Sequence, residues 1–420
     1  MCTAVATSAT ARLRASVRQA KAMLTTAEAS AAILAVITGA KTETVALEKA
    51  HGRVLRQSVV AERDQPPFDR VTMDGIALSF AEFAGGTRRF PVQALQAAGD
   101  PALTLEAGNC IEIMTGASLP AGADCIVPVE RVGVQDGVAT IENDYAATAR
   151  QFVHARGSDH VQGTELLRPG TRISPVDIAI IASCGLRDVV VSQQPTIRVI
   201  STGNELVPAG APIEPHQIRM SNGPAMVALL EQHGFTNCSH HHIVDEPALL
   251  RERIAGHLDE ANVLILSGGV SMGKADYVPG VLKELGVEVI FHKVSQRPGK
   301  PMWFGMGPGG QAVFALPGNP VSSLVCCRQY VLPALYRASG LRDAPPEFAS
   351  LAQAVTFSPA LTFFLPVKLV SAVGGQTLAM PVHTNTSGDF AALTGTAGYV
   401  ELALEESSFP AGTGARLHRW

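Results

Sequence analysis

The spacing of apolar residues changes character along the chain. From about Thr26 to Val60, apolar positions recur at intervals that place them on one helical face, and few helix-breaking residues interrupt them. This spacing predicts a helical segment. From Pro66 to about Arg156, short Val, Ile and Leu runs alternate with Gly, Pro and Asp, as in "GNCIEIMTGASLPAGADCIVPVERV". Such punctuation is typical of β-strands joined by turns and predicts a small β-rich domain.

The clearest pattern lies between Pro195 and Gly340. "TIRVIST" and "NVLILSGG" are continuous apolar runs, which are typical of parallel strands covered on both faces. Each run is followed by a glycine turn and a helical segment, and "AVFALPGNPVSSLVCCRQYVLPALY" repeats this plan. The alternation predicts a doubly wound α/β domain, in which ligands bind outside the carboxyl ends of the strands. The turns "STGNE", "SGGVSMGKADY" and "PGNP" are therefore expected along one edge of the sheet.

Two further segments complete the expected organisation. Between residues 157 and 194 the pattern returns to helix, with Pro175 near a helix start and Gly185 just past its end. After Leu341, "FFLPVKLVSA", "QTLAMPV" and "GYVELALEE" alternate as strands do, which predicts a C-terminal all-β domain. We thus expect a multidomain α/β protein with these parts: a flexible extension (1–25), a discontinuous helical or linker domain (26–65 and 157–194), a β-rich domain (66–156), an α/β domain (195–340) and a C-terminal β domain (341–420).

Composition narrows the class of protein. The chain has 420 residues, of which 46% are hydrophobic and 17% are charged, so it can bury several cores and is not globally disordered. A net charge of -4 argues against nonspecific binding to nucleic acid or to an acidic membrane. No apolar run reaches the ~18 residues of a membrane-spanning helix. We expect a soluble protein with no nucleic-acid or membrane partner.

Cysteine usage and the N-terminus bear on the compartment. The seven cysteines include no C-x-x-C pair, which favours a reducing compartment without a disulfide framework. The first 26 residues contain no acid but four basic residues, Arg12, Arg14, Arg18 and Lys21. That composition fits either an organellar transit peptide or a frayed extension on a cytoplasmic protein, and we favour the second.

The predicted edge of the α/β domain carries anion-binding chemistry. Glycines let backbone N–H groups converge on an anion, and hydroxyl groups add donors. "SGGVSMG" offers both directly after a buried strand, although it is neither a Walker A loop nor a G-x-G-x-x-G motif. "RPGKP" supplies Arg297 and Lys300, and Lys293 precedes Arg297 by four residues. Each turn alone is compatible with ordinary turn chemistry, but the combination predicts a phosphate or oxyanion site.

Carboxylates and histidines near this edge raise the question of a metal. Asp245 precedes a predicted helix and could be its cap, whereas Asp245 and Asp276 together could hold Mg²⁺ against phosphate oxygens. The run His240, His241 and His242 does not predict a metal site, because consecutive side chains point in different directions. In "DQPPFDRVTMDGIALS", Asp69 and Asp74 could serve a turn or a function.

Together the motifs resemble a known family. "PPFDRVTMDG", "IMTGASLPAGAD", "STGNEL", "SGGVSMGKADY", "RPGKP", "LPGNPVS" and "TSGDFAAL" occur in the order and approximate spacing of the molybdopterin molybdenumtransferases, the MoeA proteins and the corresponding domain of gephyrin. The resemblance runs from about Thr26 to the C-terminus. The α/β domain alone also resembles the adenylyltransferase that precedes this enzyme in its pathway, but the N-terminal part and the β tail favour the molybdenumtransferase.

The resemblance implies a reaction and partners. Such enzymes take adenylylated molybdopterin and molybdate, insert the metal into the dithiolene and release AMP, with Mg²⁺ or a similar divalent cation. They form elongated homodimers of four-domain subunits, in which the α/β domain of one subunit and the β-rich domain of the other enclose the cleft. A molybdopterin adenylyltransferase acts upstream, and molybdoenzymes or their chaperones act downstream. Two alternatives stay open, namely a non-catalytic molybdopterin carrier or scaffold and a related adenylyltransferase.

The resemblance also implies roles for individual residues, while Asp69 matches no functional position and is expected in a local turn. The expected catalytic residues are Asp74, Thr115, Asp159, Asp245 and Asp276, of which Asp245 and Asp276 are the expected metal ligands. The expected substrate-binding residues are Ser201, Thr202, Gly203, Glu205, Ser267, Gly268, Gly269, Ser271, Lys293, Arg297, Lys300, Pro317, Gly318, Pro320 and Ser387.

Some positions depart from the family pattern. Asn204 stands where an aspartate is usual, Lys274 where an acid is common, and Arg297 where bacterial sequences have lysine. Pro366 stands where an arginine often assists molybdate binding, and a proline cannot donate a hydrogen bond. Lys368, two residues on, is expected on the same strand face as Pro366. A specialised paralogue is therefore compatible with the sequence.

Overall fold

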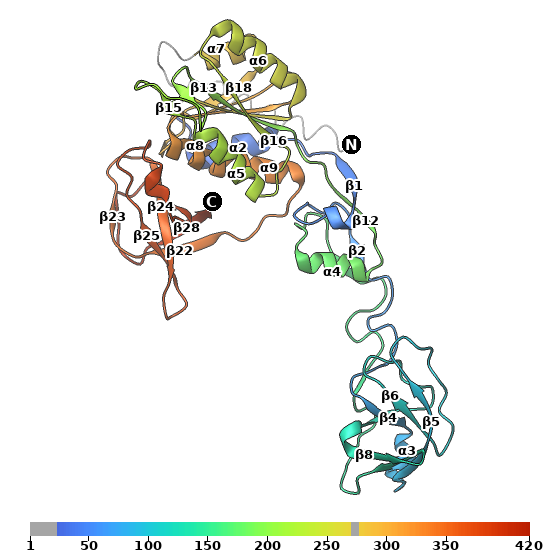
Figure 1. Ribbon diagram of the computed structural model, residues 1–420. Helices are drawn as coiled ribbons and strands as arrows, with labels where there is room; N and C mark the ends of the chain where they lie inside the picture. Colours follow the sequence, from blue (N-terminus) through green and yellow to red (C-terminus); the bar gives the residue numbers. More distant parts are fainter. Residues whose placement is uncertain (1–22, 270–276) are drawn as a thin grey trace, which may run out of the picture.

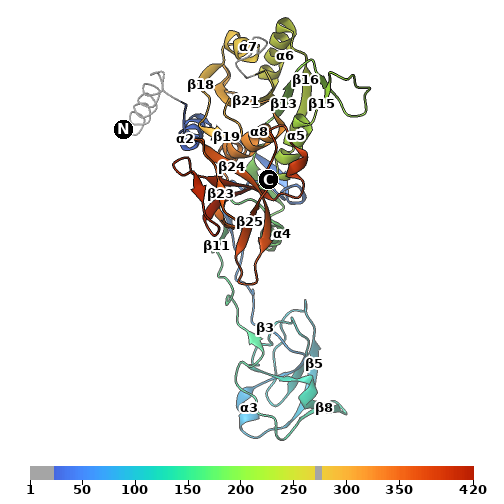
Figure 2. The same cartoon turned by 90° about the vertical axis from the view of Figure 1, so that its left-hand side faces the viewer.

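The computed structural model describes residues 23–269 and 277–420 of an elongated molecule. In Figure 1 the α/β domain and the C-terminal β domain lie at one end, and the β-rich domain lies at the other. Figure 2, turned by 90°, shows the same separation. The expectations for the extension 1–22 and for Ser271, Lys274 and Asp276 lie outside the described residues.

The α/β domain is built on a six-stranded sheet. Its strand order is β16-β13-β17-β21-β20-β18, and β16, β13, β17 and β21 run parallel, while β20 is antiparallel to β21 and β18. All five residues of β17 are buried, as expected for a continuous apolar run covered on both faces. The strands are β13 (Ile197–Thr202), β16 (Cys238–Ile243), β17 (Val263–Ser267), β18 (Glu288–His292), β20 (Trp303–Met306) and β21 (Ala312–Leu316), with a separate pair β14 (Leu206–Val207) and β15 (Ile218–Arg219).

Helices cover both faces of this sheet, which confirms the predicted doubly wound architecture (Figure 1). On one face lie α5 (Asn222–Gln232), α8 (Pro320–Cys326), a π-helical turn (Cys327–Val331) and α9 (Leu332–Ser339), and on the other lie α6 (Pro247–Glu260) and α7 (Val278–Glu284). Prolines mark the starts of two of these helices. Pro247 and Pro320 occupy the first turns of α6 and α8, where a proline costs no hydrogen bond.

The first described helix belongs to this α/β core. Helix α2 (Thr26–Val36) begins with a capping box between Thr25 and Glu28, and its Ala29 and Ile33 are buried against the α/β sheet. The prediction of helix as far as Val60 is wrong beyond Val36. The chain instead forms β1 (Thr42–Ala46), a short 3-10 turn (Leu47–Lys49) and β2 (Val59–Val60). Three of the five residues of β1 are β-branched, and β1 pairs antiparallel with β12 (Asp188–Ser192).

The helix predicted near Pro175 is present as α4 (Pro175–Ser183). Ser174 and Asp177 form a capping box at its start, and Gly185, with a φ of +72°, follows its end. Apolar side chains of α4 pack with β12 and with the segment around Leu55 in a small core of their own. This core lies between the α/β domain and the β-rich domain (Figure 1).

Two antiparallel chain segments connect that core to the β-rich domain. They pair as β2 with β11 (Glu165–Leu167) and as β3 (Arg70–Val71) with β10 (Val153–His154). The β-rich domain contains one sheet of order β7-β4-β6-β5-β9-β8. Its elements are β4 (Gly75–Leu78), α3 (Phe80–Ala84), β5 (Arg89–Gln96), β6 (Cys110–Ile113), β7 (Cys125–Pro128), a 3-10 turn (Val129–Arg131), β8 (Val132–Gln135) and β9 (Val138–Ile141).

The C-terminal domain is a closed five-stranded barrel. Strand β24 pairs with both β25 and β26, so the order β24-β25-β22-β28-β26 returns to its start. The short strand β19 (Gln296–Arg297) of the α/β domain adds to β24 and links the two domains. The C-terminal elements are β22 (Glu347–Leu351), β23 (Val355–Thr356), β24 (Thr362–Ser371), β25 (Thr377–Pro381), a 3-10 turn (Ala391–Leu393), β26 (Gly398–Leu402), β27 (Ser408–Phe409) and β28 (Gly414–Arg419).

Within residues 23–269 and 277–420, no helix combines the length and the apolar character needed to cross a membrane.

Candidate active site

The ends of two neighbouring strands bring the first two predicted turns together. Ser201 and Thr202 end β13, Ser267 ends β17, and all three side chains are buried. A Cβ atom on Gly268 would lie 2.6 Å from the carbonyl oxygen of Thr202, so only glycine allows the backbone to pass this close. The hydroxyl of Thr202 is buried without a hydrogen-bond partner in the described part of the chain. A donor is therefore available at the carboxyl end of the sheet.

Asn222, at the start of α5, links the "PGNP" turn after β21 to the turn after β17. Its side-chain amide donates hydrogen bonds to the hydroxyl of Ser267 (2.9 Å) and to the carbonyl oxygen of Gly318 (2.7 Å). The Cα of Gly268 lies 3.5 Å from the position that a Cβ of Gly318 would take. The three turns thus share one edge, as predicted. Asn222 was not among the predicted site residues, although "SNG" directly before an apolar helical pattern is a signal for a polar residue at a helix start.

A contact between two domains places Ser387 beside Asn319 of the "PGNP" turn. The side-chain amide of Asn319 donates a 2.7 Å hydrogen bond to the hydroxyl of Ser387, and the backbone N–H of Val321 donates to the carbonyl oxygen of Ser387 (3.0 Å). Asn319 was also missed, even though it lies inside the motif "LPGNPVS". The contact fixes the N-terminus of α8 against the C-terminal barrel.

A groove with a volume of about 460 Å³ runs between these domains. Arg297 and Lys300 line it from the α/β domain, and both are exposed. The other predicted site residues in its lining are Pro317 and Ser387. Two long cations and a hydroxyl around one space are suited to bind an oxyanion.

Three positions considered for oxyanion binding add no cation or hydrogen-bond donor to the groove lining. Pro366 lies buried in the groove wall, so this position presents no hydrogen-bond donor. Lys368 lies beside Gly395 and is not among the residues that line the groove, so it does not take over that function. Lys293 lies at the base of the loop, half-buried and with a φ of +76°, and it does not line the groove either.

The histidines of β16 support the first turn. Nε2 of His240 lies 2.9 Å from the Ser201 hydroxyl in a hydrogen bond, and Nε2 of His242 lies 2.8 Å from the carbonyl oxygen of Gly203. His241 faces away from them and packs against His257, with ring centroids 4.5 Å apart and the rings tilted by 51°. This alternation separates the three side chains, as predicted from strand geometry. Burial and the neighbouring histidines lower the pKa of His240, which favours its neutral form.

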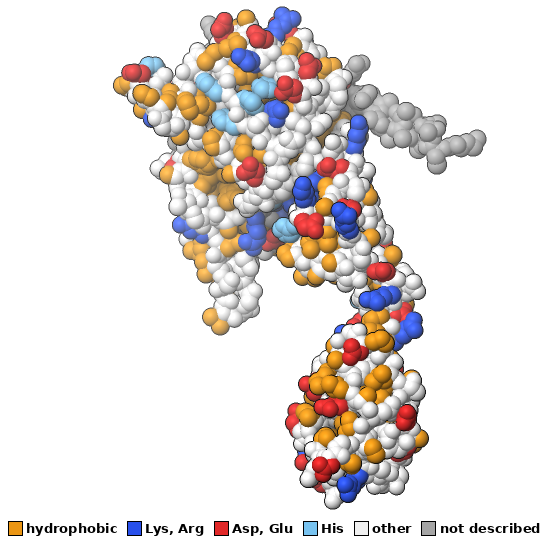
Figure 3. All heavy atoms as spheres, turned by 45° about the vertical axis from the view of Figure 1, so that its right-hand side comes forward, with side chains coloured by type: hydrophobic (Ala, Val, Ile, Leu, Met, Phe, Trp, Pro, Cys, Tyr) orange, Lys and Arg blue, Asp and Glu red, His pale blue; other side chains and the backbone are white. Residues whose placement is uncertain are grey.

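Figure 3 shows histidine side chains gathered on the surface of the α/β domain, while acidic and basic side chains are mixed elsewhere on this face. Within the described residues, no group of three His, Cys, Asp or Glu side chains could hold a metal ion. A cation held by one or two carboxylates and by substrate phosphates would need no such group.

Asp245 is the described member of the predicted metal pair. Its backbone N–H donates a 3.0 Å hydrogen bond to the side-chain oxygen of Asn204, so the departure from the family at position 204 still supports this segment. Glu246, not Asp245, occupies the N-cap position of α6, which removes the simple capping explanation of Asp245. Glu205 is exposed, and its carboxylate folds back over Gly203.

Asp74 and Thr115 form a second group in the β-rich domain. One carboxylate oxygen of Asp74 accepts hydrogen bonds from the Thr115 hydroxyl (2.7 Å) and from the Thr115 backbone N–H (2.6 Å). These bonds lower the pKa of Asp74, so its carboxylate stays ionised. A Cβ atom on Gly75 would lie 1.9 Å from the carbonyl oxygen of Val127, which explains the Asp-Gly pair. The β-rich domain, which holds this group, lies at the opposite end of the molecule from the α/β domain and the barrel, whose residues line the groove (Figure 1).

Asp159 and Asp69 lie where the connecting segments meet the β-rich domain. Asp159 accepts from Nε2 of His154 at 3.0 Å. Asp69 accepts from the Arg150 guanidinium (2.7 Å) and from the backbone N–H of Arg156 (2.9 Å). Asp69 therefore joins segments that lie 81 and 87 residues apart in the chain, so its contacts are structural but are not those of the local turn that the sequence predicted.

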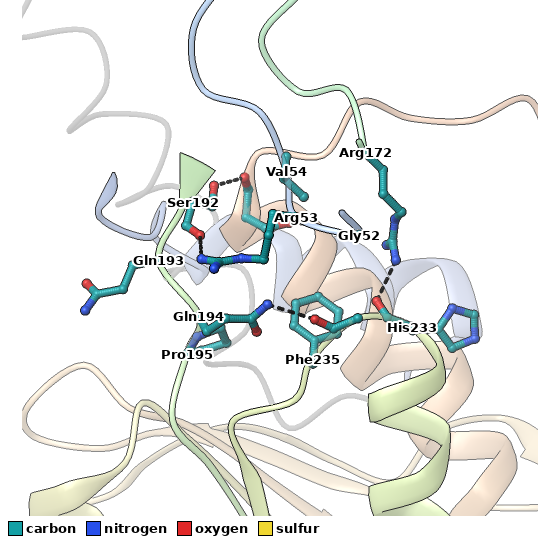
Figure 4. A pocket seen from close by; sticks show the side chains of 12 residues that line it. Gly52, Arg53, Val54, Arg172, Ser192, Gln193, Gln194, Pro195, His233 and Phe235 are labelled. Carbon is teal, nitrogen blue, oxygen red and sulfur yellow. Dashed lines mark hydrogen bonds between the residues drawn. The ribbon is translucent and has the colours of Figure 1, made fainter. Parts of the chain in front are cut away.

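Between the α/β domain and the small core of α4, Figure 4 shows a second cavity. It has a volume of about 20 Å³, and hydrogen bonds from Arg172 to the His233 carbonyl (2.6 Å) and from Gln194 to the Gly234 carbonyl (2.8 Å) cross it. A cavity of this size holds about one water molecule. It contains none of the predicted site residues and is too small for a substrate.

Comparisons with known proteins agree with this arrangement. Residues 16–185 match the model of the MoeA N-terminal region (domain I and II), and residues 198–337 match that of a probable molybdopterin binding domain. The molybdopterin molybdenumtransferase of Synechocystis sp. is 39% identical over 90% of this chain and 95% of its own length. This chain belongs to the molybdopterin molybdenumtransferase family. The family resemblance inferred from the motifs is thereby confirmed, and the protein is a transferase of molybdenum cofactor biosynthesis.

More distant members of the molybdopterin molybdenumtransferase family share the whole architecture. The enzyme of Staphylococcus epidermidis is 30% identical over 87% of this chain and 88% of its own. The crystal structure of the molybdopterin biosynthesis MoeA protein from Pyrococcus horikoshii superposes with a TM-score of 0.79 at 30% identity, covering 95% of this chain and 99% of that one. The fold class predicted from the sequence is therefore confirmed.

Proposed function

We propose that the protein inserts molybdenum from molybdate into adenylylated molybdopterin, releasing AMP, and that the groove between the α/β domain and the barrel binds the molybdate. The main support for this proposal is the Asn319–Ser387 hydrogen bond. It joins the two domains at the groove that Arg297, Lys300 and Ser387 line. These are the groups that an oxyanion requires. A cytoplasmic location, an upstream molybdopterin adenylyltransferase and downstream molybdoenzymes or chaperones follow from the same proposal.

The turns at the carboxyl ends of β13, β17 and β21 supply the binding site for the rest of the substrate. Ser201, Thr202 and Ser267 would donate to the pterin phosphate and the adenylate, and the glycines let the backbone approach them. His240 and His242 hold the first turn in place and leave its other polar groups available. The remaining proposed contacts of these turns are Gly203, Glu205, Gly268, Gly269, Ser271, Pro317, Gly318 and Pro320, while Lys293, which follows β18, is proposed to hold substrate phosphate or molybdate.

The donor set fits a hard divalent cation. Asp245 is a half-buried carboxylate whose backbone is fixed by Asn204, and carboxylate oxygen is what Mg²⁺ prefers. We propose that Asp245 and Asp276 hold Mg²⁺ against the substrate phosphates. When bound, the cation would neutralise the charge that develops as the adenylate bond breaks.

The distance between the two groups of site residues favours a homodimer. Asp74, Thr115 and Asp159 lie in or beside the β-rich domain, and this domain is separated from the two domains that line the groove of the same chain (Figure 1). We propose that a second copy contributes them to the cleft. The ionised Asp74 would then orient or bind a cationic or hydroxyl group of the substrate complex.

The test combines purified protein, adenylylated molybdopterin, molybdate and Mg²⁺. AMP release and active cofactor, measured by reconstituting an apo-molybdoenzyme, are the expected result. Arg297→Ala should lower the activity at limiting molybdate, whereas Arg251→Ala, at an exposed position of α6, should not. Binding of the pterin without AMP release at any molybdate concentration would instead identify a carrier, which the donor-free Pro366 in the groove wall would fit.

The cation is tested separately. Chelation with EDTA should stop AMP release, and added Mg²⁺ should restore it. Asp245→Asn should raise the Mg²⁺ concentration for half-maximal activity by about tenfold, the usual cost of one charge-assisted contact. Asp259→Asn, at an exposed position of α6, is the matched control. Full activity in EDTA would remove the proposed role of the cation without affecting the insertion reaction.

A further inference from the structure

The loop that carries Arg297 and Lys300 encloses a buried glutamine. Its two sides are joined by hydrogen bonds from the backbone N–H of Lys293 to the Met302 carbonyl (2.8 Å) and from that of Val294 to the Lys300 carbonyl (3.0 Å). Gln296 lies within this loop and is 0% exposed, although its neighbour Arg297 faces the groove. An amide side chain is costly to bury unless it is hydrogen-bonded, so its partners show what it stabilises.

Both ends of the Gln296 amide are hydrogen-bonded. Its nitrogen donates to the carbonyl oxygen of Pro298 at 3.0 Å, and its oxygen accepts from the hydroxyl of Tyr330. A carbonyl oxygen only accepts, so the nitrogen must face the loop and the oxygen must face the tyrosine. Tyr330 is 1% exposed, and burial raises its pKa well above the ordinary value, so its hydroxyl stays protonated and can donate.

The helical segment on which the loop packs is irregular where it presents Tyr330 to Gln296. Tyr330 lies in the π-helical turn Cys327–Val331, which directly follows α8, and π-helical turns often occur beside functional sites. A Cβ atom on Gly299 would lie 2.4 Å from Sγ of Cys326 and 2.6 Å from Nε2 of Gln296. The loop therefore rests directly on the end of α8 and on the Gln296 side chain.

We propose that Tyr330 and Gln296 are positioning residues for oxyanion binding. The bridge from Tyr330 through Gln296 to the Pro298 carbonyl fixes the backbone between the two cations of the loop. Arg297 and Lys300 are long and exposed, so a fixed backbone lowers the conformational entropy lost when both bind one oxyanion. The inference rests on the proposed function only for the identity of that oxyanion, molybdate.

The test compares two tyrosines that each lose only a hydroxyl. Tyr330→Phe breaks the bridge, while Tyr399→Phe removes a similarly buried hydroxyl that donates to Gln329 at 2.9 Å and does not touch the loop. Tyr330→Phe should raise the KM for molybdate about three- to tenfold, the effect of one lost hydrogen bond, with kcat within about twofold. Tyr399→Phe should leave the KM for molybdate unchanged.

Gln296→Met provides a second variant, because methionine has nearly the same volume but cannot form the bridge. It should raise the KM for molybdate to a similar extent, and the double variant with Tyr330→Phe should be no worse than the poorer single variant. Circular dichroism and thermal unfolding establish that each variant is folded. If Tyr330→Phe does not fold, Gln296→Met alone decides.

Calorimetric titration with inorganic molybdate measures binding without turnover. The same three- to tenfold weakening is expected for Tyr330→Phe, again the effect of about one hydrogen bond. Equal effects of Tyr330→Phe and Tyr399→Phe, or unchanged molybdate affinity and KM in the bridge variants, would overturn the positioning role. A wild-type protein that binds molybdate but releases no AMP would refute the proposed function alone, and one that binds no molybdate would overturn both.

Discussion

The side-chain amide of Asn319 donates a 2.7 Å hydrogen bond to the hydroxyl of Ser387, which lies 68 residues further along the chain. Asn319 precedes α8 of the α/β domain, and Ser387 belongs to the C-terminal domain. The groove that contains Arg297 and Lys300 is bounded by both domains. The bond therefore couples the relative position of two domains to the geometry of one binding site.

Removing this hydroxyl should affect substrate binding more than folding. Ser387→Ala leaves the Asn319 amide without its partner, and we expect the KM for molybdate to rise about three- to tenfold, the effect of one hydrogen bond. Steady-state kinetics of AMP release measure this. Ser358→Ala, at an exposed serine of the same domain, should behave as wild type. A similar loss in both variants would contradict a specific role of the contact.

A cleft shared between two subunits predicts complementation. Asp74→Asn and Lys300→Ala should each lower the activity at least tenfold as homodimers, because each removes a charged group from every cleft. When the two variants are unfolded together and refolded, hybrid dimers contain one cleft with both residues intact. Random pairing in a two-fold dimer should then restore about a quarter of the wild-type activity.

The complementation experiment has a direct control. A mixture of Asp74→Asn with Thr115→Ala should not recover activity, because Asp74 and Thr115 form one hydrogen-bonded group that comes from the same subunit. Failure of Asp74→Asn and Lys300→Ala to complement in verified hybrid dimers would show that the two residues do not share a cleft in that arrangement.

Parts of this site were readable from the sequence for identifiable physical reasons. Buried parallel strands are continuous apolar runs, so Ser201 and Ser267 could be placed at one sheet edge by local pattern alone. Asn222 and Asn319 were missed because their hydrogen bonds join segments far apart in the chain. Local spacing says nothing about such partners.

The helix prediction that is wrong beyond Val36 failed for a similar reason. The apolar pattern continues past Val36, but β-branched residues and pairing with β12, which lies about 150 residues away in the chain, favour the strand β1. Tertiary pairing decided between two structures that the local pattern did not separate. The burial of Gln296 was equally inaccessible, since only the packing of the loop on α8 places this amide inside.

Asp69 provides a pH-dependent prediction. The backbone N–H of Arg156 and, to a smaller extent, the Arg150 guanidinium lower the pKa of Asp69 below its ordinary value of 3.8. The carboxylate is therefore more stable in the folded state. Its contribution should be complete above that value and should be lost as the pH falls through the lowered pKa. Asp64 accepts from the backbone N–H of Gln162 and from the Arg156 guanidinium; these bonds lower its pKa too, so it should act in the same direction.

Hydrogen exchange of the connecting segments, corrected for the intrinsic pH dependence of exchange, measures this effect. Protection of residues 66–71 and 150–156 should fall in the wild type as the pH drops below 3.8, because both pKa values are lowered from that value. Asp69→Asn should lose part of this dependence and Asp64→Asn/Asp69→Asn most of it. At neutral pH, Asp69→Asn should keep its activity within about threefold, unlike Asp74→Asn, since its contacts are exposed and join only the connecting segments. A large loss of activity in Asp69→Asn would contradict its structural role.

Substitution of Gly223 tests whether His240 supports the turn after β13. A Cβ atom on Gly223 would lie 2.1 Å from Nε2 of His240, the atom that is hydrogen-bonded to Ser201. Gly223→Ala should displace the imidazole and destabilise the protein by about 1–3 kcal/mol, as overpacking does. It should also raise the KM for adenylylated molybdopterin, because Ser201 loses its partner. Chemical unfolding and AMP-release kinetics measure the two effects.

Gly256 in α6 is the matched control. It is also a helical glycine, but a Cβ there would meet nothing within 4 Å. Gly256→Ala should therefore stabilise the protein by about 0.5–1 kcal/mol through helix propensity, with unchanged kinetics. If Gly223→Ala behaved in the same way, His240 could be displaced without consequence and the turn would not depend on it. The two substitutions should change the free energy of unfolding in opposite directions. This difference separates a general effect of helix propensity from the loss of the His240–Ser201 contact.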